Sequence, residues 1–445
     1  MGSKWKTSFL TDHYSISSGL SKPAKDFGTG YPFLSFKDIF YNYFLPDSLT
    51  QLVQSTDKER ASCSVRRGDV FLTRTSETMH ELGMSSVALK DYTDATFNGF
   101  CKRLRPKETS ELEPEYVGYY LRSPVFRQSM LAFSTMSTRA SLNNEMISRL
   151  EISYPDRKIQ KKIANILLSL DEKIAISRAI NQTLEQISQT LFKSWFVDFD
   201  PVIDNALDAG NPIPEALHSR AELRQKVRNS ADFKPLPADI RALFPAEFEE
   251  MELGWIPKGW KEIKLSLLSK ITSGKRPPSK FSEPSSINNV PVWGGNGIKW
   301  FTSEHLYNER YIITGRVGTL GTFYKVNGLS WPSDNALVIQ PVNHELYELI
   351  YQSLQTKDIL SLNVGSTQPL LTQTTLGNIT FIIPLDRGLL VKFQSICDSF
   401  QEKISDNKIN IEINTTLRDT LLPKLISGEL SLEDLPDLVT QTEPA

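Results

Sequence analysis

The hydrophobic pattern is most regular between residues 155 and 196, where apolar residues recur at alternating steps of four and three. This spacing is typical of a long helix that packs against another long helix. Two polar residues, Lys173 and Ser177, fill positions in the middle of the seam. The apolar seam consists of Ile159, Ile163, Ile166, Leu170, Ile180, Leu184, Ile187 and Leu191. The pattern predicts a long helix over residues 156–196.

A second apolar run of this kind predicts another long helix over residues 385–428. Three asparagines, Asn407, Asn410 and Asn414, take seam positions in it, and buried asparagines fix the register and orientation of paired helices. A single amphipathic helix commonly lies along its own domain, but two such long helices need a partner for the part that protrudes. We therefore expect them to pair as an antiparallel coiled coil.

The chain also repeats itself. Gly19 and Gly274 lie 255 residues apart within matching neighbourhoods, whereas Glu172 and Glu402, later in the two copies, lie 230 residues apart. Self-similarity at this scale indicates two related modules, of which the first carries about 25 extra residues in its middle.

Each copy has the pattern of a mixed α+β module, in which short buried strands alternate with Gly-rich turns and helices. The expected strands are residues 70–72, 150–154, 312–313 and 379–383, and the expected helices are residues 115–121 and 345–354. The predicted fold class is therefore α+β, with two pseudo-repeated α/β domains at residues 1–155 and 254–384. The two long helices join these domains.

Residues 197–253 form a proline-rich linker between the modules. Because proline interrupts regular elements, we expect an extended connection along the surface, with a short helix at most over residues 218–227. The final residues, 429–445, are acidic and are expected to be frayed.

Length and composition restrict the class of protein. The 445 residues are too many for one ordinary core and suggest two to four domains. The three cysteines, Cys63, Cys101 and Cys397, are scattered, which fits a reducing compartment and argues against a zinc module. Neither a membrane span nor a signal peptide is evident. The expected location is cytoplasmic, and the formal net charge of -2 neither indicates nor excludes a nucleic-acid partner.

Three motifs resemble one known family. The segments LFKSWFVDFDPV (residues 191–202), GWIPKGW (254–260) and LLPKLISGE (421–429) look like the conserved regions of specificity subunits of type I restriction-modification systems. They occur in the expected order, and the resemblance covers nearly the whole chain.

The resemblance implies a DNA-binding subunit without catalytic activity, in which two target recognition domains each recognise one half of an asymmetric, bipartite DNA sequence. The paired helices would act as the spacer. Such a subunit holds no cofactor and no metal itself. It binds double-stranded DNA and two adenine-N6 methyltransferase subunits, which use S-adenosylmethionine. The assembly forms with or without two restriction (motor-nuclease) subunits, which use ATP and Mg²⁺, and no membrane contact is expected.

Candidate DNA-binding residues are the polar and basic side chains on repeated loops and next to predicted strands, which could contact phosphates and base edges. Taken individually, a lysine or arginine of this kind is more often a solvated surface charge, so the prediction concerns the loops as sets. Residues 293–297 are expected to form a flexible, Gly-rich loop that contributes an aromatic ring and an amide. The candidates are Arg74, Lys102, Arg103, Arg105, Ser137, Thr138, Arg139, Lys275, Arg276, Asn296, Arg316, Ser366, Thr367 and Gln368.

Four aromatic residues near the end of the first long helix, Phe192, Trp195, Phe196 and Phe199, are candidate contacts for a partner subunit, as exposed anchors. The alternative is that they pack between the helix and the linker.

Two other classes of function were weighed. Asp156 with Asp171 and Lys173 imitates the carboxylates and lysine of a Mg²⁺-dependent nuclease, but Asp171 and Lys173 fall inside the predicted helix, two residues apart and on different faces. The second copy has Gln401 at the corresponding position, so a nuclease is disfavoured. A coiled-coil scaffold without DNA contact is the other alternative.

The five histidines show no metal-binding or triad spacing.

Overall fold

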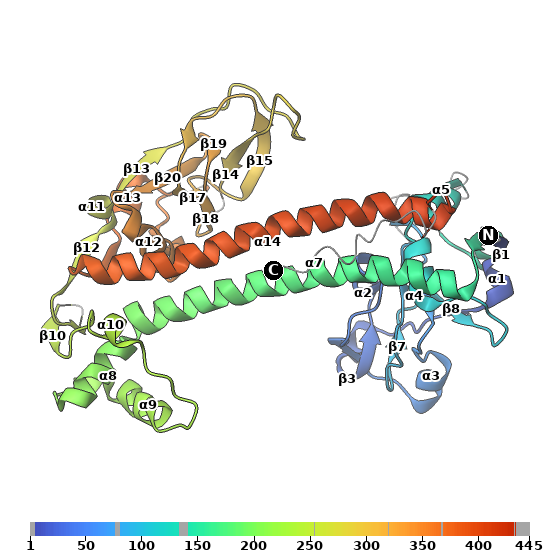
Figure 1. Cartoon of the computed structure of the whole chain (residues 1–445), viewed down its shortest axis with the longest axis horizontal. Coiled ribbons are helices and arrows are strands. Elements are labelled where there is room, and N and C mark those ends of the chain that lie inside the picture. The colour runs from blue at the N-terminus through green and yellow to red at the C-terminus, as the bar shows by residue number, and fades with distance from the viewer. Residues whose placement is uncertain are drawn as a thin grey trace. The chain divides into compact units, whose positions relative to one another are not determined.

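The computed structural model describes residues 5–75, 81–132, 141–252, 254–318, 320–365, 368–430 and 432. The chain divides into two compact units, of which unit 1 is Met1–Arg178 with Lys408–Ala445 and unit 2 is Ala179–Asn407. Each unit contains one repeated module and part of each long helix (Figure 1). We call residues 1–155 the first module and residues 254–384 the second module.

The first module is built on three sheets. A four-stranded antiparallel sheet has the order β2-β8-β5-β6, a three-stranded sheet has the order β4-β3-β7 with β3 parallel to β7, and β1 pairs with β9. The strands are β1 (Lys6–Phe9), β2 (Tyr14–Ser18), β3 (Phe27–Leu34), β4 (Gln51–Val53), β5 (Val70–Thr73), β6 (Ser85–Val87), β7 (Thr96–Phe97), β8 (Cys101–Pro106) and β9 (Glu151–Tyr154). The helices are α1 (Leu10–His13), η1 (Ala24–Asp26), α2 (Phe36–Tyr41), α3 (Asp57–Ser62), α4 (Pro114–Tyr120), α5 (Pro124–Ala132) and α6 (Asn144–Ser148).

The second module repeats this plan. Its sheets have the orders β13-β20-β17-β18, β15-β14-β19-β16 and β12-β21, and a separate hairpin joins β10 to β11. The strands are β10 (Phe248–Met251), β11 (Gly254–Pro257), β12 (Trp260–Lys264), β13 (Ser269–Ser273), β14 (Val290–Gly294), β15 (Gly297–Thr302), β16 (Tyr307–Asn308), β17 (Tyr311–Gly315), β18 (Phe323–Val326), β19 (Leu329–Pro332), β20 (Ala336–Pro341) and β21 (Thr380–Pro384). The helices are α11 (Leu265–Leu268), η5 (His344–Leu346), α12 (Tyr347–Gln355), η6 (Leu360–Leu362) and α13 (Gln373–Gly377).

The shared strand orders confirm the internal repeat, and one glycine in each copy lies at an equivalent close approach of two backbone segments. A Cβ atom added to Gly19 would lie 2.3 Å from the carbonyl oxygen of Asn98, and one added to Gly274 would lie 2.2 Å from that of Ser333. No side chain fits at either distance, so both positions require glycine where two backbone segments approach closely. The predicted strands and the predicted helices of both modules are confirmed, with ends that differ by a few residues.

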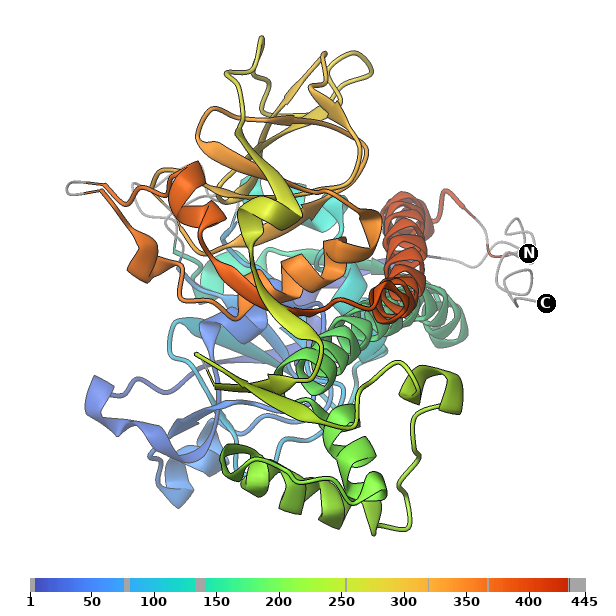
Figure 2. The ribbon, with the colours of Figure 1, turned by 90° about the vertical axis from the view of Figure 1, so that its left-hand side faces the viewer.

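The two long helices are α7 (Arg157–Phe192) and α14 (Arg387–Ser427). Within unit 2, Asn181 of α7 meets Asn407 of α14, and Phe192, further along α7, meets Phe393, further back along α14. Within unit 1, Asp171 pairs with Arg418. The helices therefore run antiparallel side by side in each unit (Figures 1 and 2), as predicted.

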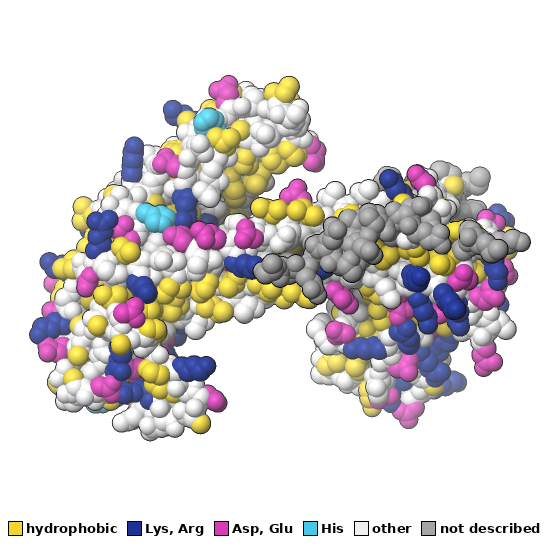
Figure 3. All heavy atoms as spheres, in the orientation of Figure 1, with side chains coloured by type: hydrophobic (Ala, Val, Ile, Leu, Met, Phe, Trp, Pro, Cys, Tyr) yellow, Lys and Arg dark blue, Asp and Glu magenta, His cyan; other side chains and the backbone are white. Residues whose placement is uncertain are grey.

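The seam itself differs from the prediction in the second half of α7. Ile180 and Ile187 are 38% and 44% exposed, and Ser188 is buried in their place. A straight helix has 3.6 residues per turn, so its buried face drifts away from a strict seven-residue repeat. Apolar side chains accordingly remain visible along the helices (Figure 3). Of the asparagines, Asn407 is buried and donates to Asn181 Oδ1 at 2.7 Å, which confirms its predicted position in the seam, whereas Asn410 is exposed.

The prediction of an extended linker over residues 197–253 is wrong. After α7, a short π-helix (Lys193–Val197) leads into α8 (Asp200–Ala209), and η4 (Glu215–Leu217), α9 (His218–Arg228) and α10 (Ala238–Arg241) follow. The prolines do not interrupt these helices because they lie between them or in a first turn, where the missing N–H has no partner to lose. The prediction of a helix near residues 218–227 is confirmed by α9.

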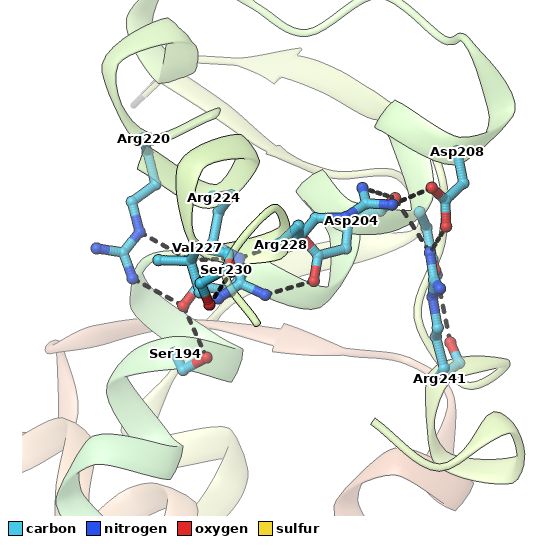
Figure 4. Close-up of polar contacts among 11 residues, drawn as sticks. Ser194, Asp204, Asp208, Arg220, Arg224, Val227, Arg228, Ser230 and Arg241 are labelled. Atoms are coloured by element: carbon cyan, nitrogen blue, oxygen red, sulfur yellow. Dashed lines mark hydrogen bonds and ion pairs between the residues drawn. The ribbon is translucent and has the colours of Figure 1, made fainter. Parts of the chain in front are cut away.

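A ladder of ion pairs holds α8 against α9 (Figure 4). Asp200, Asp204 and Asp208 recur every four residues on α8, and each pairs with the arginine twenty residues later, namely Arg220, Arg224 and Arg228. The constant separation means that α8 and α9 run parallel. Side chains four apart share a helix face, which a search for apolar periodicity does not detect because the contact is polar.

Candidate nucleic-acid interface

Arg74 and Arg316 occupy equivalent places in the two modules. Each is exposed and follows the central strand of its four-stranded sheet, β5 or β17. The backbone N–H of Arg74 donates to Phe100 O at 2.8 Å, and Leu142 N donates to Arg74 O at 2.8 Å. The second module repeats both bonds, because Arg316 N donates to Asn335 O and Leu371 N donates to Arg316 O, each at 2.9 Å.

These bonds place each arginine beside the end of the repeated loop that the sequence suggested for DNA contact. Ser137, Thr138, Arg139, Ser366 and Thr367 lie outside the described residues. Gln368, which follows the last two, is described and exposed. On the described flanks of the two loops, Thr75 bridges to Ser141 and Val317 bridges to Leu370.

The prediction that Lys102, Arg103 and Arg105 form an exposed basic cluster is wrong. All three lie on β8, where Lys102 and Arg103 are only 8% and 6% exposed. Lys102 Nζ donates to Ser18 Oγ at 2.9 Å, Arg103 Nη1 donates to Ser64 O at 2.6 Å, and Arg105 pairs with the buried Asp69 at 2.6 Å. Burial lowers the pKa of Lys102 and of Arg103. Each of the three side chains instead has a partner within the first module.

The basic and amide candidates of the second module lie at its surface. Lys275 and Arg276 are exposed just after β13, and Lys275 N donates to Pro332 O at 2.9 Å. Asn296 is also exposed, but residues 293–297 do not form a flexible loop as predicted. They form the tight turn of the β14–β15 hairpin, in which Gly294 pairs with Gly297. Gly297 has a φ of 95°, which side chains rarely adopt and which glycine allows.

The aromatic candidates near the end of α7 are buried, so their predicted exposure is wrong and the alternative of internal packing is confirmed. Phe192, Trp195, Phe196 and Phe199 are 4%, 1%, 5% and 6% exposed. Trp195 and Phe196 lie 5.9 and 4.9 Å from the Phe393 ring on α14, between ring centroids. These rings join the core of unit 2 because the chain folds back over them after α7.

An apolar groove remains open beside this cluster within unit 2. Its volume is about 500 Å³, and its walls come from α7, α8, α9 and the segment after α9. Ile187 and Val227 line it and are 44% and 39% exposed, and Leu191, Phe233 and Leu236 complete its apolar wall. A groove of this kind between helices can accept an apolar side chain or helix face of another protein.

Asp171, the carboxylate of the nuclease-like pattern, is engaged in the helix pair. Its Oδ1 atom pairs with Arg418 Nη1 at 2.6 Å, and its Oδ2 atom accepts a hydrogen bond from the Tyr119 hydroxyl at 2.6 Å. Burial, with the nearby Asp171 carboxylate, raises the pKa of Tyr119 above its ordinary value. Among the residues that the structure describes, no group of three or more His, Cys, Asp or Glu side chains could hold a metal ion.

Two α+β modules of equal topology on a pair of antiparallel helices, with an arginine at the same strand end of each, define a chain of the DNA-specificity class. The family model described as "Type I restriction modification DNA specificity domain" matches residues 2–186 and 257–415, and the chain belongs to this family. None of the described helices is long and apolar enough to cross a membrane.

Known relatives agree with this assignment over their full length. The chain is 28% identical to the type I restriction enzyme HindI specificity subunit of Haemophilus influenzae, over 96% of this chain and 100% of the relative. It is 26% identical to the MjaIX specificity subunit of Methanocaldococcus jannaschii, over 97% and 94%. The crystal structure of the S subunit from M. genitalium has the same fold, with a TM-score of 0.57 and 17% identity over 95% of this chain and 96% of that chain.

Proposed function

We propose that the chain recognises an asymmetric, bipartite DNA sequence, with each module recognising one half. The observation that carries the proposal is that the modules share one backbone frame but differ in the side chains around it. A shared frame gives both modules the same way of approaching a duplex, and different side chains give each module its own preferred bases.

Two adenine-N6 methyltransferase subunits, which carry S-adenosylmethionine, are the proposed partners of this chain. Their docking surface would include the long helices and the groove lined by Ile187 and Val227, where apolar side chains are exposed. Restriction subunits that use ATP and Mg²⁺ would join the same assembly. In this proposal the chain positions DNA and performs no chemistry.

The two rival functions make different demands on the structure. A nuclease centred on Asp171 would need that carboxylate to be available for a metal, whereas both of its oxygens have partners in the helix pair. A scaffold that never contacts DNA would not need an arginine at the same strand end of each module.

Mapping of methylated adenines tests the proposal. The chain is expressed with an adenine methyltransferase subunit from its own source organism in a host that lacks other adenine methylation, and modified positions are sequenced genome-wide. We expect one motif with two specific halves separated by unspecified base pairs. The purified complex should bind this motif with an affinity that falls as salt rises. Methylation without a bipartite motif, or assembly of the complex without DNA binding at any salt concentration, would overturn the proposal.

A further inference from the structure

A tight turn at the same strand end is built identically in the two modules. In the first module Cys101 N donates to Asn98 O at 3.0 Å, and in the second Ala336 N donates to Ser333 O at 3.0 Å. Each turn contains a residue whose carbonyl oxygen accepts a hydrogen bond from the backbone N–H of the arginine that follows the central strand. Phe100 accepts from Arg74 in the first module, and Asn335 accepts from Arg316 in the second. Phe100 and Asn335 are therefore equivalent positions.

Both turns are held against a second backbone segment. Leu20 N donates to Phe97 O at 2.8 Å, and Lys275 N donates to Pro332 O at 2.9 Å. In the first module the turn is fixed further, because Phe100 N donates to the Asn98 side chain at 2.8 Å and Gly99 N donates to Leu20 O at 2.9 Å. The side chain at position 100 is consequently presented from a rigid support.

The residues at this end differ in one informative way. Both modules have an exposed arginine at the strand end, Arg74 in the first and Arg316 in the second. At the turn, by contrast, the first module has Phe100 and the second has Asn335 at the equivalent position. Phe100 is 64% exposed, so packing within the module does not explain an aromatic ring there. Contacts to phosphate carry no sequence information, so one residue type can make them in both modules, whereas contacts to different bases need different side chains.

We propose that Phe100 and Asn335 are base-recognising residues of the two modules, and that Arg74 and Arg316 hold the adjacent phosphates. The inference rests on the proposed function. In the major groove an apolar ring such as that of Phe100 contacts the C5 methyl group of thymine, and an asparagine such as Asn335 makes two hydrogen bonds with the N6 and N7 atoms of adenine. The first half-site should thus contain a thymine at the contacted position, and the second half-site an adenine.

The test uses the complex of the full chain with its methyltransferase and a duplex that carries the mapped motif. Each thymine is replaced in turn by deoxyuridine, which lacks only the methyl group, and each adenine by 7-deazaadenine, which lacks N7. We expect one deoxyuridine position to weaken binding about tenfold for the unmodified protein and to have no effect on Phe100→Ala. One 7-deazaadenine position should behave in the same way towards Asn335→Ala.

Two further variants separate the proposed roles. Arg74→Ala should weaken binding to every sequence and reduce the slope of log K against log salt by about one, whereas Phe100→Ala should leave that slope unchanged. Val342→Ala is the matched control, because Val342 is 58% exposed just beyond the opposite end of β20 from Asn335. It should bind as the unmodified chain does.

The outcomes distinguish the inference from the function on which it rests. If the unmodified complex has no specific bipartite motif, the proposed function fails. If the motif exists, but every base analogue weakens binding of the unmodified chain and of Phe100→Ala and Asn335→Ala by the same factor, this inference alone fails. It also fails if Phe100→Ala prevents assembly with the methyltransferase and leaves DNA binding intact, because the ring would then contact protein.

Discussion

The two modules share their strand order but are attached to the long helices by different side chains. In unit 1, Tyr119 of α4 donates to Asp171 of α7, which pairs with Arg418 of α14. In unit 2, the equivalent helix α12 contributes Glu348, whose side chain is 3% exposed and pairs with Lys325 at 2.6 Å. One attachment is a partly hydrated ion pair, and the other is a buried polar network next to an aromatic core.

The network around Glu348 connects the second module to both long helices. Gln352 Nε2 donates to Glu348 Oε1 at 2.8 Å, Ser188 of α7 donates to the same oxygen at 3.3 Å, and Gln394 of α14 accepts a hydrogen bond from Glu348 N at 2.9 Å. The first module uses a glutamine in a related way, since Gln160 of α7 accepts from Glu113 N at 2.9 Å. Backbone topology is thus retained between the copies, while the side chains that fix each module to the helices have diverged.

The two units should differ most in the unfolding free energy that is lost when a buried side chain is truncated at equivalent positions of the long helices. Phe393 is fully buried among the aromatic rings of unit 2, and its counterpart Ile163 is 2% exposed in unit 1. We expect Phe393→Ala to cost about 3–5 kcal/mol of unfolding free energy and Ile163→Ala about 2–4 kcal/mol. Urea unfolding gives these values, and hydrogen exchange locates each loss to one unit. A greater loss for Ile163→Ala would show that the aromatic cluster is not the stronger attachment.

Removing one charge from each ion pair should have the next largest effect. Glu348→Gln removes the buried charge that pairs with the partly exposed Lys325, and we expect a cost of about 2–3 kcal/mol. Asp171→Asn acts on a side chain that is 26% exposed, and about 1 kcal/mol is expected. The double variant Glu348→Gln/Lys325→Met should recover part of the loss, as a thermodynamic cycle would measure. Equal costs for the two single variants would contradict the contrast between the attachments.

The equivalent glycines should, by contrast, respond alike. Gly19→Ala and Gly274→Ala each place a methyl group within 2.3 Å of a backbone carbonyl oxygen. The backbone must move in either variant, at an expected cost of about 1–2 kcal/mol. Thermal unfolding of both variants measures this. If only one variant is destabilised, the two modules do not both require glycine at this close approach of the backbone.

The sequence predicted the parts of the fold that depend on repetition and on alternating polarity. The strand at residues 70–72, the strand before each long helix and the helices themselves all follow from local patterns that the structure confirms. The antiparallel pairing followed from the presence of two such helices. These features are predictable because each is specified within one segment of chain.

Features that depend on distant partners were not predictable in this way. Nothing near Arg105 in sequence indicates that it pairs with Asp69, and Trp195 is buried only because Phe393 and Phe244 meet it from other parts of the chain. The recurrence of aspartates and arginines every four residues in α8 and α9 could have revealed their ladder, had polar side chains been compared as well as apolar ones. Equivalence of Phe100 and Asn335 required the backbone hydrogen bonds, because the two sequences around them differ.

The smallest predicted effect concerns the ion pairs in the segment that follows α7. The chain after α7 folds into α8, α9 and α10, and Arg228 of α9 and Arg241 of α10 form ion pairs with Asp208 of α8. Hydrogen bonds from Arg228 and Arg241 hold the pKa of Asp208 below its ordinary value. The folded state therefore favours the ionised carboxylate, and the resulting stability is present above the unfolded pKa of about 3.9 and is lost as pH falls through the lower folded value.

Asp208→Asn should accordingly destabilise the chain at pH 7 but not at a pH below the folded pKa of Asp208. The side chain is 44% exposed, so solvent screens the pair and we expect less than about 1 kcal/mol at pH 7. Thermal unfolding of the two proteins across pH 2–7 measures the difference, and Asp232→Asn, at an exposed position in the same segment, serves as the control. A difference that stays constant as pH falls would mean that Asp208 stabilises α8 through its shape or hydrogen bonding rather than through its charge.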